Sequence, residues 1–408
     1  MRLQLVNAAE HVSVVNWPFD QPLQEWTIDN LREVTGLHRH VVRMVAGPIA
    51  YVVKELPDPL AEREWRLLRE LAEAGLPTAE VVGVVTGRSN SEGLLITRHL
   101  EFSLPYRTLL SRSGIGIPYL GQRMLDALAG LLVQLHLAGF YWGDCSLSNT
   151  LFRRDAGALA AYIIDVETGE SHEKLSDGQR RLDILIATEN VIGGLLDLQA
   201  AGSLADGIDP VETALAIEHS YNQLWLELTG VDEFNADETF RVDQRLRRLH
   251  ELGFDAAELE LVSTEDGERL RLVPRVVEHG FHAHRLRNLT GIHAGENQAR
   301  RLLNDISRYR AVLEQRSGKK IKEVIAADHW LEERFDRALA GIPPELSGKL
   351  DAAELYHQVL EHRWFLSERA GGDVGMEETV SSYVSNVLAH APAEQIVTPT
   401  PDDWPTDE

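Results

Sequence analysis

The sequence predicts an α+β protein in which a strand-rich part is followed by a helix-rich part. Between residues 36 and 100, short apolar runs separated by glycine, proline and polar turns predict five strands and one helix. After residue 100, apolar side chains recur at helical spacing, most clearly over 119–139. This change of pattern predicts two lobes, and a further change near residue 230 predicts another, mostly helical domain.

Composition limits the class of protein. A chain of 408 residues is long enough for two or three domains, and its charged fraction of 25% is that of an ordinary soluble protein. The formal net charge of -24 argues against a general nucleic-acid or anionic-membrane binder. Cys145 is the single cysteine, so no internal disulfide can form and a reducing compartment is expected. Without a signal segment or a long apolar run, the sequence predicts a cytoplasmic protein with no membrane span.

The predicted domain boundaries follow these patterns. We expect a lead-in at 1–33, a strand-rich lobe at 34–101, a helical lobe at 102–230, a mostly helical domain with one hairpin at 231–390 and a tail at 391–408. The lead-in is predicted to be irregular, with one strand, one short helix and no function. The tail is rich in proline and acidic residues and is predicted to be disordered.

A lysine and a glutamate in the first lobe form a candidate phosphate-binding pair. Lys54 stands among apolar neighbours in the third strand, and Glu64 lies in the first half of the helix. A strand lysine paired with a helix glutamate positions the ATP phosphates in kinases. Glu62 and Glu70 are rival carboxylates that spacing alone does not exclude, and two unrelated surface charges are the other interpretation. The elements of this lobe are expected at 36–40, 41–45, 50–56, 61–74 (the helix), 80–86 and 93–100.

The segments that would cover the nucleotide are less distinctive. No G-x-G-x-x-G motif lies near the first strand, where Gly36 is a lone glycine. His38, Arg39 and His40 could contact phosphate with their side chains, or could be solvated turn residues. The segment 98–101, with His99, would form the hinge between the lobes, where backbone groups meet adenine.

The loop after the 124–137 helix carries the candidate chemistry. Asp144 and Asn149 are five residues apart, a strand and turn follow at 150–157, and Asp165 ends a second strand at 159–166. In phosphoryl transfer one carboxylate orients the attacking hydroxyl, while an Asn and a second Asp hold Mg²⁺. Mg²⁺ prefers a few hard oxygen ligands and keeps several waters. The alternative is that these residues only cap turns and helices.

The helical lobe continues with Asp183 at the start of a helix at 182–198. Helices are also expected at 103–113 and between 200 and 230. The stretch from Asp165 to Asp183 is too short for a long substrate-gating segment, so a small-molecule or sugar hydroxyl is a better acceptor than a protein.

The second half has a basic region in an acidic chain. Nine arginines and three acidic residues lie between Arg269 and Arg310. This region could receive an anionic partner, or it could be a solvated helix face. Its histidines lack cysteine partners and zinc spacing, so no metal site is assigned. Expected elements are helices at 239–252, 298–314, 321–340, 352–370 and 377–390, and a hairpin with strands at 259–262 and 270–277.

Residues from about 36 to 200 resemble the atypical bacterial kinases, above all the lipopolysaccharide (Kdo) kinase group and its RIO and aminoglycoside-phosphotransferase relatives. The resemblance is carried by R-E-W-R-L-L-R-E-L-A-E-A-G-L-P at 63–77, L-H-L-A-G-F-Y-W-G-D-C-S-L-S-N-T-L at 135–151 and I-I-D-V-E at 163–167. The chain to about residue 390 is also similar to a bacterial family called domain of unknown function 4032. These motifs are specific for the kinase half and say nothing of the rest.

The resemblance implies a bilobal protein-kinase-like fold, with a small antiparallel β lobe and a helical C-lobe, followed by a mostly helical domain. It implies Asp144 as the catalytic residue, Lys54 as the phosphate-binding residue and Asp183 as a brace for the catalytic loop. Asn149 and Asp165 would be the Mg²⁺ ligands, and ATP the cofactor.

Three positions depart from the kinase pattern. Trp142 stands where kinases usually have His, Glu167 replaces the Gly of the Asp-Phe-Gly turn, and the glycine-rich loop is degenerate. The sequence therefore predicts an ATP- and Mg²⁺-dependent phosphotransferase acting on a small-molecule, sugar or lipid-linked hydroxyl. The alternative is a pseudokinase or nucleotide-binding regulatory module that uses its arginine-rich half for interaction, and nucleic-acid binding is a distant third.

Overall fold

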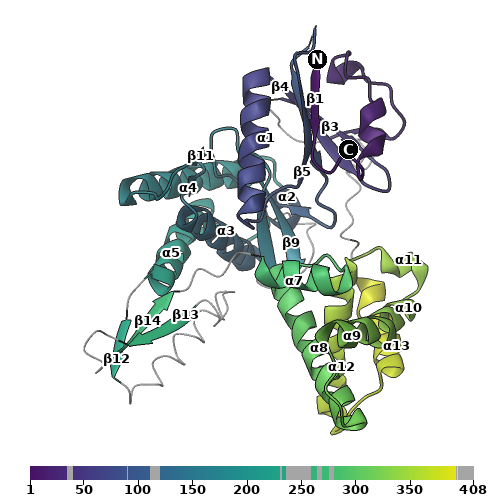
Figure 1. Cartoon of the computed structure of the whole chain (residues 1–408). Helices are drawn as coiled ribbons and strands as arrows, with labels where there is room; N and C mark the ends of the chain where they lie inside the picture. The colour runs from purple at the N-terminus through teal and green to yellow at the C-terminus, as the bar shows by residue number, and fades with distance from the viewer. Residues whose placement is uncertain are drawn as a thin grey trace.

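A computed structural model describes residues 1–34, 40–89, 91–110, 120–229, 232–235, 259–263, 269–274, 280–391 and 393. The predicted helix at 239–252 and almost all of the predicted tail lie outside these residues, as does nearly all of the predicted strand at 36–40. An antiparallel sheet with one long helix is followed by a helical part and then by a second group of helices (Figure 1). The mixed fold with an antiparallel N-terminal lobe and a helical C-terminal region is confirmed.

The N-terminal lobe is built on a six-stranded antiparallel sheet. Its order is β1 (Arg2–Leu5), β5 (Val81–Thr86), β6 (Gly93–Arg98), β4 (Tyr51–Leu56), β3 (Val41–Val45) and β2 (Leu31–Glu33). The segment 1–33 is thus not a separate lead-in, because it supplies both edge strands. It also adds the short helices η1 (Val12–Asn16) and η2 (Leu23–Glu25).

Different parts of the chain pack on the two faces of this sheet. Side chains of a strand alternate between faces, and in β4 the fully buried Val53 packs into a core with Val14, Leu23 and Trp26 of the N-terminal segment. The opposite face is covered by α1 (Asp58–Glu73), which begins directly after Pro57. The α1 residues Ala61, Glu64, Leu67, Leu68 and Leu71 are buried at helical spacing, so Glu64 lies on the face that meets the sheet.

In the described ranges 102–110 and 120–229, the helical lobe combines four helices with short strands. The helices are α2 (Tyr106–Leu110), α3 (Leu120–Leu137), α4 (Asp177–Ala200) and α5 (Pro210–Thr229). The helix expected from residue 103 starts later, because Leu104–Pro105 forms β7. β7 extends the hairpin of β9 (Thr150–Asp155) and β10 (Ala158–Ile163), while β8 (Phe140–Tyr141) pairs with β11 (Glu170–Ser171).

Two local signals set boundaries that differ from those expected. The hairpin turn is only Ala156-Gly157, with φ of 52° and 85°, so β9 runs on through residues that were expected to form the turn. β10 starts one residue earlier than expected and ends at Ile163, before the expected end at residue 166. Helix α4 starts at Asp177 because Ser176 and Gln179 form a capping box at its N-terminus.

The C-terminal part has a core of its own. Strands β12 (Asp232–Asn235), β14 (Arg269–Pro274) and β13 (Leu259–Ser263) form an antiparallel sheet that has one strand more than the expected hairpin.

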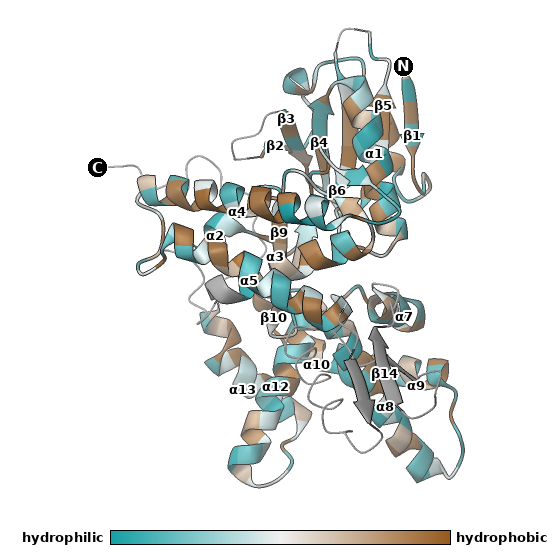
Figure 2. Ribbon diagram, turned by 90° about the vertical axis from the view of Figure 1, so that its left-hand side faces the viewer, coloured by the Kyte–Doolittle hydropathy of each residue, from teal (hydrophilic) through white to brown (hydrophobic). Residues whose placement is uncertain are grey.

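The helices that follow alternate between hydrophobic and hydrophilic residues along their ribbons (Figure 2) and enclose a core around Trp330 and Tyr356. They are α7 (Phe281–Thr290), α8 (Glu296–Ser317), α9 (Glu323–Trp330), a π-helical turn η4 (Leu331–Asp336), α10 (Arg337–Ala340), α11 (Pro344–Ser347), α12 (Ala352–Ala370), α13 (Met376–Asn386) and η5 (Leu388–His390). Within the described ranges, no helix has both the length and the apolar character needed to cross a bilayer.

Candidate active site between the two lobes

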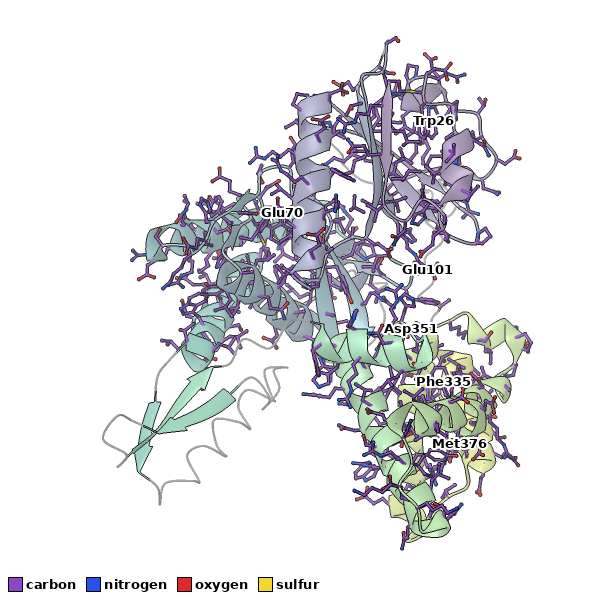
Figure 3. The ribbon with its side chains drawn as sticks, viewed as in Figure 1. Trp26, Glu70, Glu101, Phe335, Asp351 and Met376 are labelled. Atoms are coloured by element: carbon purple, nitrogen blue, oxygen red, sulfur yellow. The ribbon has the colours of Figure 1, made fainter. Side chains whose placement is uncertain are left out.

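Lys54 joins the two lobes through an ion-pair cluster. Its Nζ lies 3.0 Å from Oε2 of Glu64 on α1 and 2.8 Å from Oδ2 of Asp165, which follows β10. The rival carboxylates point elsewhere, since Glu62 accepts a hydrogen bond from Thr86 and Glu70 accepts one from Ser171 (Figure 3). Of the three glutamates considered from the sequence, Glu64 is therefore the partner of Lys54.

Burial and neighbouring charges shift the pKa values of Glu64 and Lys54. Glu64 is completely buried, and burial together with the nearby charge of Asp165 raises its pKa to about 7, against the opposing effect of Lys54. Burial also disfavours the charge on Lys54, but Glu64 and Asp165 outweigh it, so the pKa of Lys54 is raised. Lys54 is therefore a cation at neutral pH, held by two acids that come from different lobes.

Asp144 is held in place by two asparagines. Nδ2 of Asn149 donates to Oδ2 of Asp144 at 3.0 Å, and Nδ2 of Asn190 on α4 donates to Oδ1 at 3.1 Å. Asn190 also donates to the carbonyl of Cys145 at 3.1 Å, which fixes the loop beyond the aspartate. Because Asn149 uses its amide nitrogen here, its Oδ1 remains available as an acceptor or metal ligand.

The pKa of Asp144 is shifted by burial and by the carboxylates around it. Burial raises the pKa of Asp144; the asparagine hydrogen bonds lower it, and the charges of Asp165 and Glu167 raise it further, with a net upward shift. Such repulsion between carboxylates is relieved when a cation binds among them.

The β9–β10 hairpin brings Asn149 and Asp165 together. Asn149 directly precedes β9, Asp165 follows β10, and Thr150 pairs with Ile163 across the two strands. The N–H of Ile164 donates to the carbonyl of Asn149 at 3.1 Å, which closes this end of the hairpin. Two residues that are sixteen positions apart in sequence thus become neighbours at the site.

Asp183 supports the loop that carries Asp144. It is fully buried, and it accepts hydrogen bonds from the backbone N–H groups of Trp142 at 2.7 Å and Gly143 at 2.8 Å. Nε2 of His136 lies 3.0 Å from the same carboxylate, and Nδ1 of His136 is 2.8 Å from the hydroxyl of Tyr221. The two residues before Asp144 are therefore fixed from below by a buried charge.

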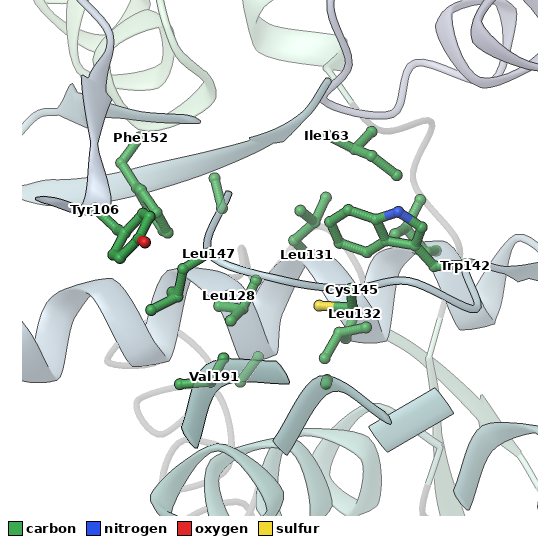
Figure 4. Close-up of a cluster of buried hydrophobic side chains, with 14 of the residues drawn as sticks. Tyr106, Leu128, Leu131, Leu132, Trp142, Cys145, Leu147, Phe152, Ile163 and Val191 are labelled. Atoms are coloured by element: carbon green, nitrogen blue, oxygen red, sulfur yellow. The ribbon is translucent and has the colours of Figure 1, made fainter. Parts of the chain in front are cut away.

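Trp142, the departure from the kinase pattern, is part of this support. Its ring is fully buried in the cluster of Leu131, Leu132, Cys145 and Ile163 (Figure 4). The indole Nε1 donates to the carbonyl oxygen of Asp165 at 2.9 Å. Tryptophan therefore links the catalytic loop to the Asp165 turn directly.

Glu167 adds a third carboxylate near Lys54. Its Oε2 lies 3.9 Å from Nζ of Lys54 and 2.9 Å from Nε2 of His40, while its backbone N–H donates to Asp165. His40 is the one residue of the segment 36–40, which was expected to cover the nucleotide, that the structure describes. The candidate residues Gly36, His38 and Arg39 in that segment lie outside the described residues.

At the hinge, His99 uses its backbone N–H in the sheet, where it donates to the carbonyl of Ala50 at 2.8 Å. Its side chain is half-buried, and burial lowers its pKa, partly offset by Glu101. Any contact of His99 with a nucleotide would therefore involve the side chain or the carbonyl group, and its role stays a prediction.

Several arginines of the arginine-rich region contact other residues of the chain where their side chains are described. Arg285 contacts Glu323 at 2.6 Å, Arg301 contacts His357, and Arg310 lies 3.9 Å from Glu314. Side chains between residues 269 and 279 lie outside the described set. An anionic partner at this region stays a prediction.

Sequence reasoning missed the role of Asn190. It lies seven residues after Asp183 on α4, two helical turns on the same face. That spacing is the one signal that could have suggested a second contact from α4 to the catalytic loop.

The arrangement has the types of donor that a magnesium nucleotide needs. Asp165 and Asn149 carry hard oxygens at the same end of the hairpin, Lys54 offers a cation for phosphate, and Asp144 offers a carboxylate bonded to Asn149. These residue types fit the groups that the sequence implied.

Two family models match separate parts of the chain. Residues 32–184 match the family model for the lipopolysaccharide kinase (Kdo/WaaP) family, and residues 223–388 match the domain of unknown function DUF4032. A solved structure described as "WaaP in complex with acyl carrier protein" is similar at 18% identity, over 62% of this chain and 99% of that chain, with a TM-score of 0.38. None of the curated proteins matches the chain. The expected resemblance to the lipopolysaccharide kinase family and to DUF4032 is therefore confirmed over these two ranges, and the first match indicates a kinase-like phosphotransferase.

Proposed function

We propose that the protein is an ATP- and Mg²⁺-dependent phosphotransferase that acts on the hydroxyl group of a small-molecule, sugar or lipid-linked acceptor. The observation that carries the proposal is Lys54, which bridges Glu64 of one lobe and Asp165 of the other. ATP would supply the transferable phosphoryl group, and Mg²⁺ would supply the positive charge that offsets the clustered carboxylates.

The chain's own residues have distinct roles in this proposal. Lys54 binds phosphate oxygens, and Glu64 keeps its side chain extended. Asn149 and Asp165 hold the metal through oxygen atoms. Asp144 accepts a hydrogen bond from the acceptor hydroxyl and orients it for attack.

The choice of a small acceptor rests on the segment after Asp165. Helix α4 starts at Asp177, and β11 lies between the two, so little chain is available for a long protein-docking segment. This supports a small-molecule or glycan hydroxyl over a protein substrate.

The test separates binding from chemistry. In Asp165→Asn we expect Mg²⁺-dependent thermal stabilisation by ATP to be lost, because a metal ligand is weakened. In Asp144→Asn this stabilisation should remain while ATP turnover falls by about 10²-fold or more, the usual range for a positioned acid–base group. Asp209→Asn, which alters an exposed helix cap far from Lys54 in sequence, serves as the control. Unchanged ATP turnover in both site variants would contradict the proposal.

One observation favours a second candidate, a nucleotide-binding regulatory module without transferase activity. Glu167 places an additional carboxylate within 3.9 Å of Lys54, where it competes with phosphate oxygens. Stabilisation by ATP that needs no Mg²⁺, with no turnover in the wild type, would favour the module.

A further inference from the structure

The tip of the β9–β10 hairpin caps a helix of the C-terminal part. Helix α8 begins after Gly295, which has no side chain to satisfy the free N–H groups of the first turn. Asp155 of the hairpin takes that place, since Oδ1 accepts from the N–H of Gln298 at 2.7 Å and Oδ2 from the N–H of Asn297 at 3.0 Å. A carboxylate at a helix N-terminus is also favoured by the helix dipole.

The fit between the hairpin and α8 is close. Asp155 is 2% exposed, and a Cβ atom added to Gly295 would lie 2.5 Å from its Oδ1. Glycine at the helix start therefore leaves room for a carboxylate that comes from 140 residues earlier in the chain. The side chain of Asn297 adds a further hydrogen bond to Asp155 at 3.1 Å.

Two more contacts hold the same tip. Oε2 of Glu354 on α12 accepts from the backbone N–H of Ala156 at 3.2 Å and from Nε2 of Gln298 at 2.8 Å. Asp351, the N-cap of α12, is labelled in Figure 3. Arg153 lies 3.4 Å from it. Ala156 has a left-handed φ of 52°, a conformation that alanine adopts at a cost and that persists where neighbours fix it.

The other end of the hairpin is the candidate active site. Each strand has six residues, so tip and site are separated by about 20 Å at roughly 3.3 Å per residue. Figure 1 shows β9 running from the helical lobe to the start of the C-terminal helices. The strands are paired over their whole length, from Asp155–Ala158 to Thr150–Ile163. A displacement of the tip is therefore transmitted to Asn149 and Asp165.

We propose that the C-terminal helices position the catalytic hairpin, and that Asp155 is a positioning residue for the metal ligands Asn149 and Asp165. This inference rests on the proposed function, and it gives the region that matches DUF4032 a task in the reaction. The contacts of Asp155 and Ala156 with α8 and α12 set the angle at which the hairpin enters the site. This angle determines the separation of Asn149 and Asp165.

The test measures how much Mg²⁺ is needed for ATP to stabilise the full-length protein. In Asp155→Asn the amide nitrogen faces a backbone N–H donor, so the cap is lost on one side. We expect the Mg²⁺ concentration for half-maximal stabilisation to rise by about 2- to 30-fold, the range of coupling from remote residues. Hydrogen exchange should speed up along β9 and β10 as far as Ile164. Asn297→Ala, which removes one side-chain bond and leaves the backbone cap, is the milder variant if Asp155→Asn folds poorly.

The matched control is Asp305→Asn, a carboxylate that accepts hydrogen bonds within the C-terminal helices. Asp305 accepts from Trp330 at 2.7 Å and from Tyr356 at 3.0 Å, and it does not contact the hairpin. Asp305→Asn should lower the melting temperature without changing the Mg²⁺ requirement. Suppose that Mg²⁺ and ATP stabilise the wild type, and that the Asp155 and Asp305 variants need the same Mg²⁺ concentration for half-maximal stabilisation. The inference is then wrong, while the proposed function stands. No response in the wild type would overturn both, and faster exchange confined to residues 155–158 would overturn the positioning role alone.

Discussion

Replacing Asp183 with asparagine tests whether the buried support of the catalytic loop controls turnover. The carboxylate accepts from the backbone N–H groups of Trp142 and Gly143 and lies within hydrogen-bond distance of His136. Asparagine has one acceptor oxygen and a donating amide, so one of the two backbone N–H groups loses its acceptor in either orientation. An unsatisfied buried N–H costs about 1–3 kcal/mol, and exchange of a charged acceptor for a neutral one adds roughly 1 kcal/mol.

We therefore expect Asp183→Asn to lower the free energy of unfolding by about 2–4 kcal/mol, measured by urea denaturation. At a temperature where the variant is fully folded, ATP turnover should still fall at least about tenfold, equivalent to about 1.4 kcal/mol in the barrier, because the loop that carries Asp144 is loosened. The matched control is Asp209→Asn, whose carboxylate accepts from the N–H groups of Val211 and Glu212 at the start of α5. Equal turnover in the folded fractions of the two variants would refute the reasoning.

Three further predictions concern other contacts of the site. Asn190→Ala should lower ATP turnover about tenfold with nucleotide affinity unchanged, since the variant frees the Asp144 carboxylate but leaves the phosphate-binding groups intact. Glu64→Gln should weaken nucleotide binding, measured by titration calorimetry, by about tenfold because Lys54 loses a charged partner. Burial raises the pKa of Asp155 to about 6 from 3.8, against the hydrogen bonds that it accepts, so the folded chain retains a proton that the unfolded chain releases. The free energy of unfolding should therefore decrease as pH rises from about 4 to about 6, by up to about 3 kcal/mol, and Asp155→Asn should remove that slope.

Each of these predictions has its own control and its own contrary result. Glu189→Gln, next to Asn190 but exposed on α4, should leave turnover unchanged; a loss of nucleotide affinity in Asn190→Ala would contradict the assigned role. Glu62→Gln is the control for Glu64, and equal affinities of these two variants would count against the Lys54 pair. A pH slope that persists in the Asp155 variant would show that other groups cause it.

Local sequence patterns predict most of the strands of the first lobe and the pairing of Asp144 with Asn149. The strand at 41–45 has the expected bounds, and the strand that carries Lys54 starts one residue later than expected, because alternating apolar residues next to Gly-Pro define a strand without reference to its partners. Asp144 and Asn149 could be paired from sequence because they are close together in one loop. Their bond at 3.0 Å is a local contact.

Contacts between distant elements could not be derived in this way. The sequence left Glu62, Glu64 and Glu70 as alternatives, because all three lie on one helix and only its rotation against the sheet decides which one meets Lys54. The sequence predicts an irregular segment 1–33 with one strand and one short helix, whereas β1 and β2 pair at opposite edges of the sheet with β5 and β3.

The amino-acid sequence by itself determined the order of strands and helices and the types of side chain that stand at the loop ends. Periodicity encodes which face of an element is buried, and this is a property of neighbouring residues. Only the tertiary structure decided that α4 supports the catalytic loop twice, through Asp183 and Asn190, and that Asp155 caps a helix 140 residues further along. Those contacts depend on how whole elements pack, because a hydrogen bond specifies its partner by position in space and the sequence specifies that position only through the complete fold.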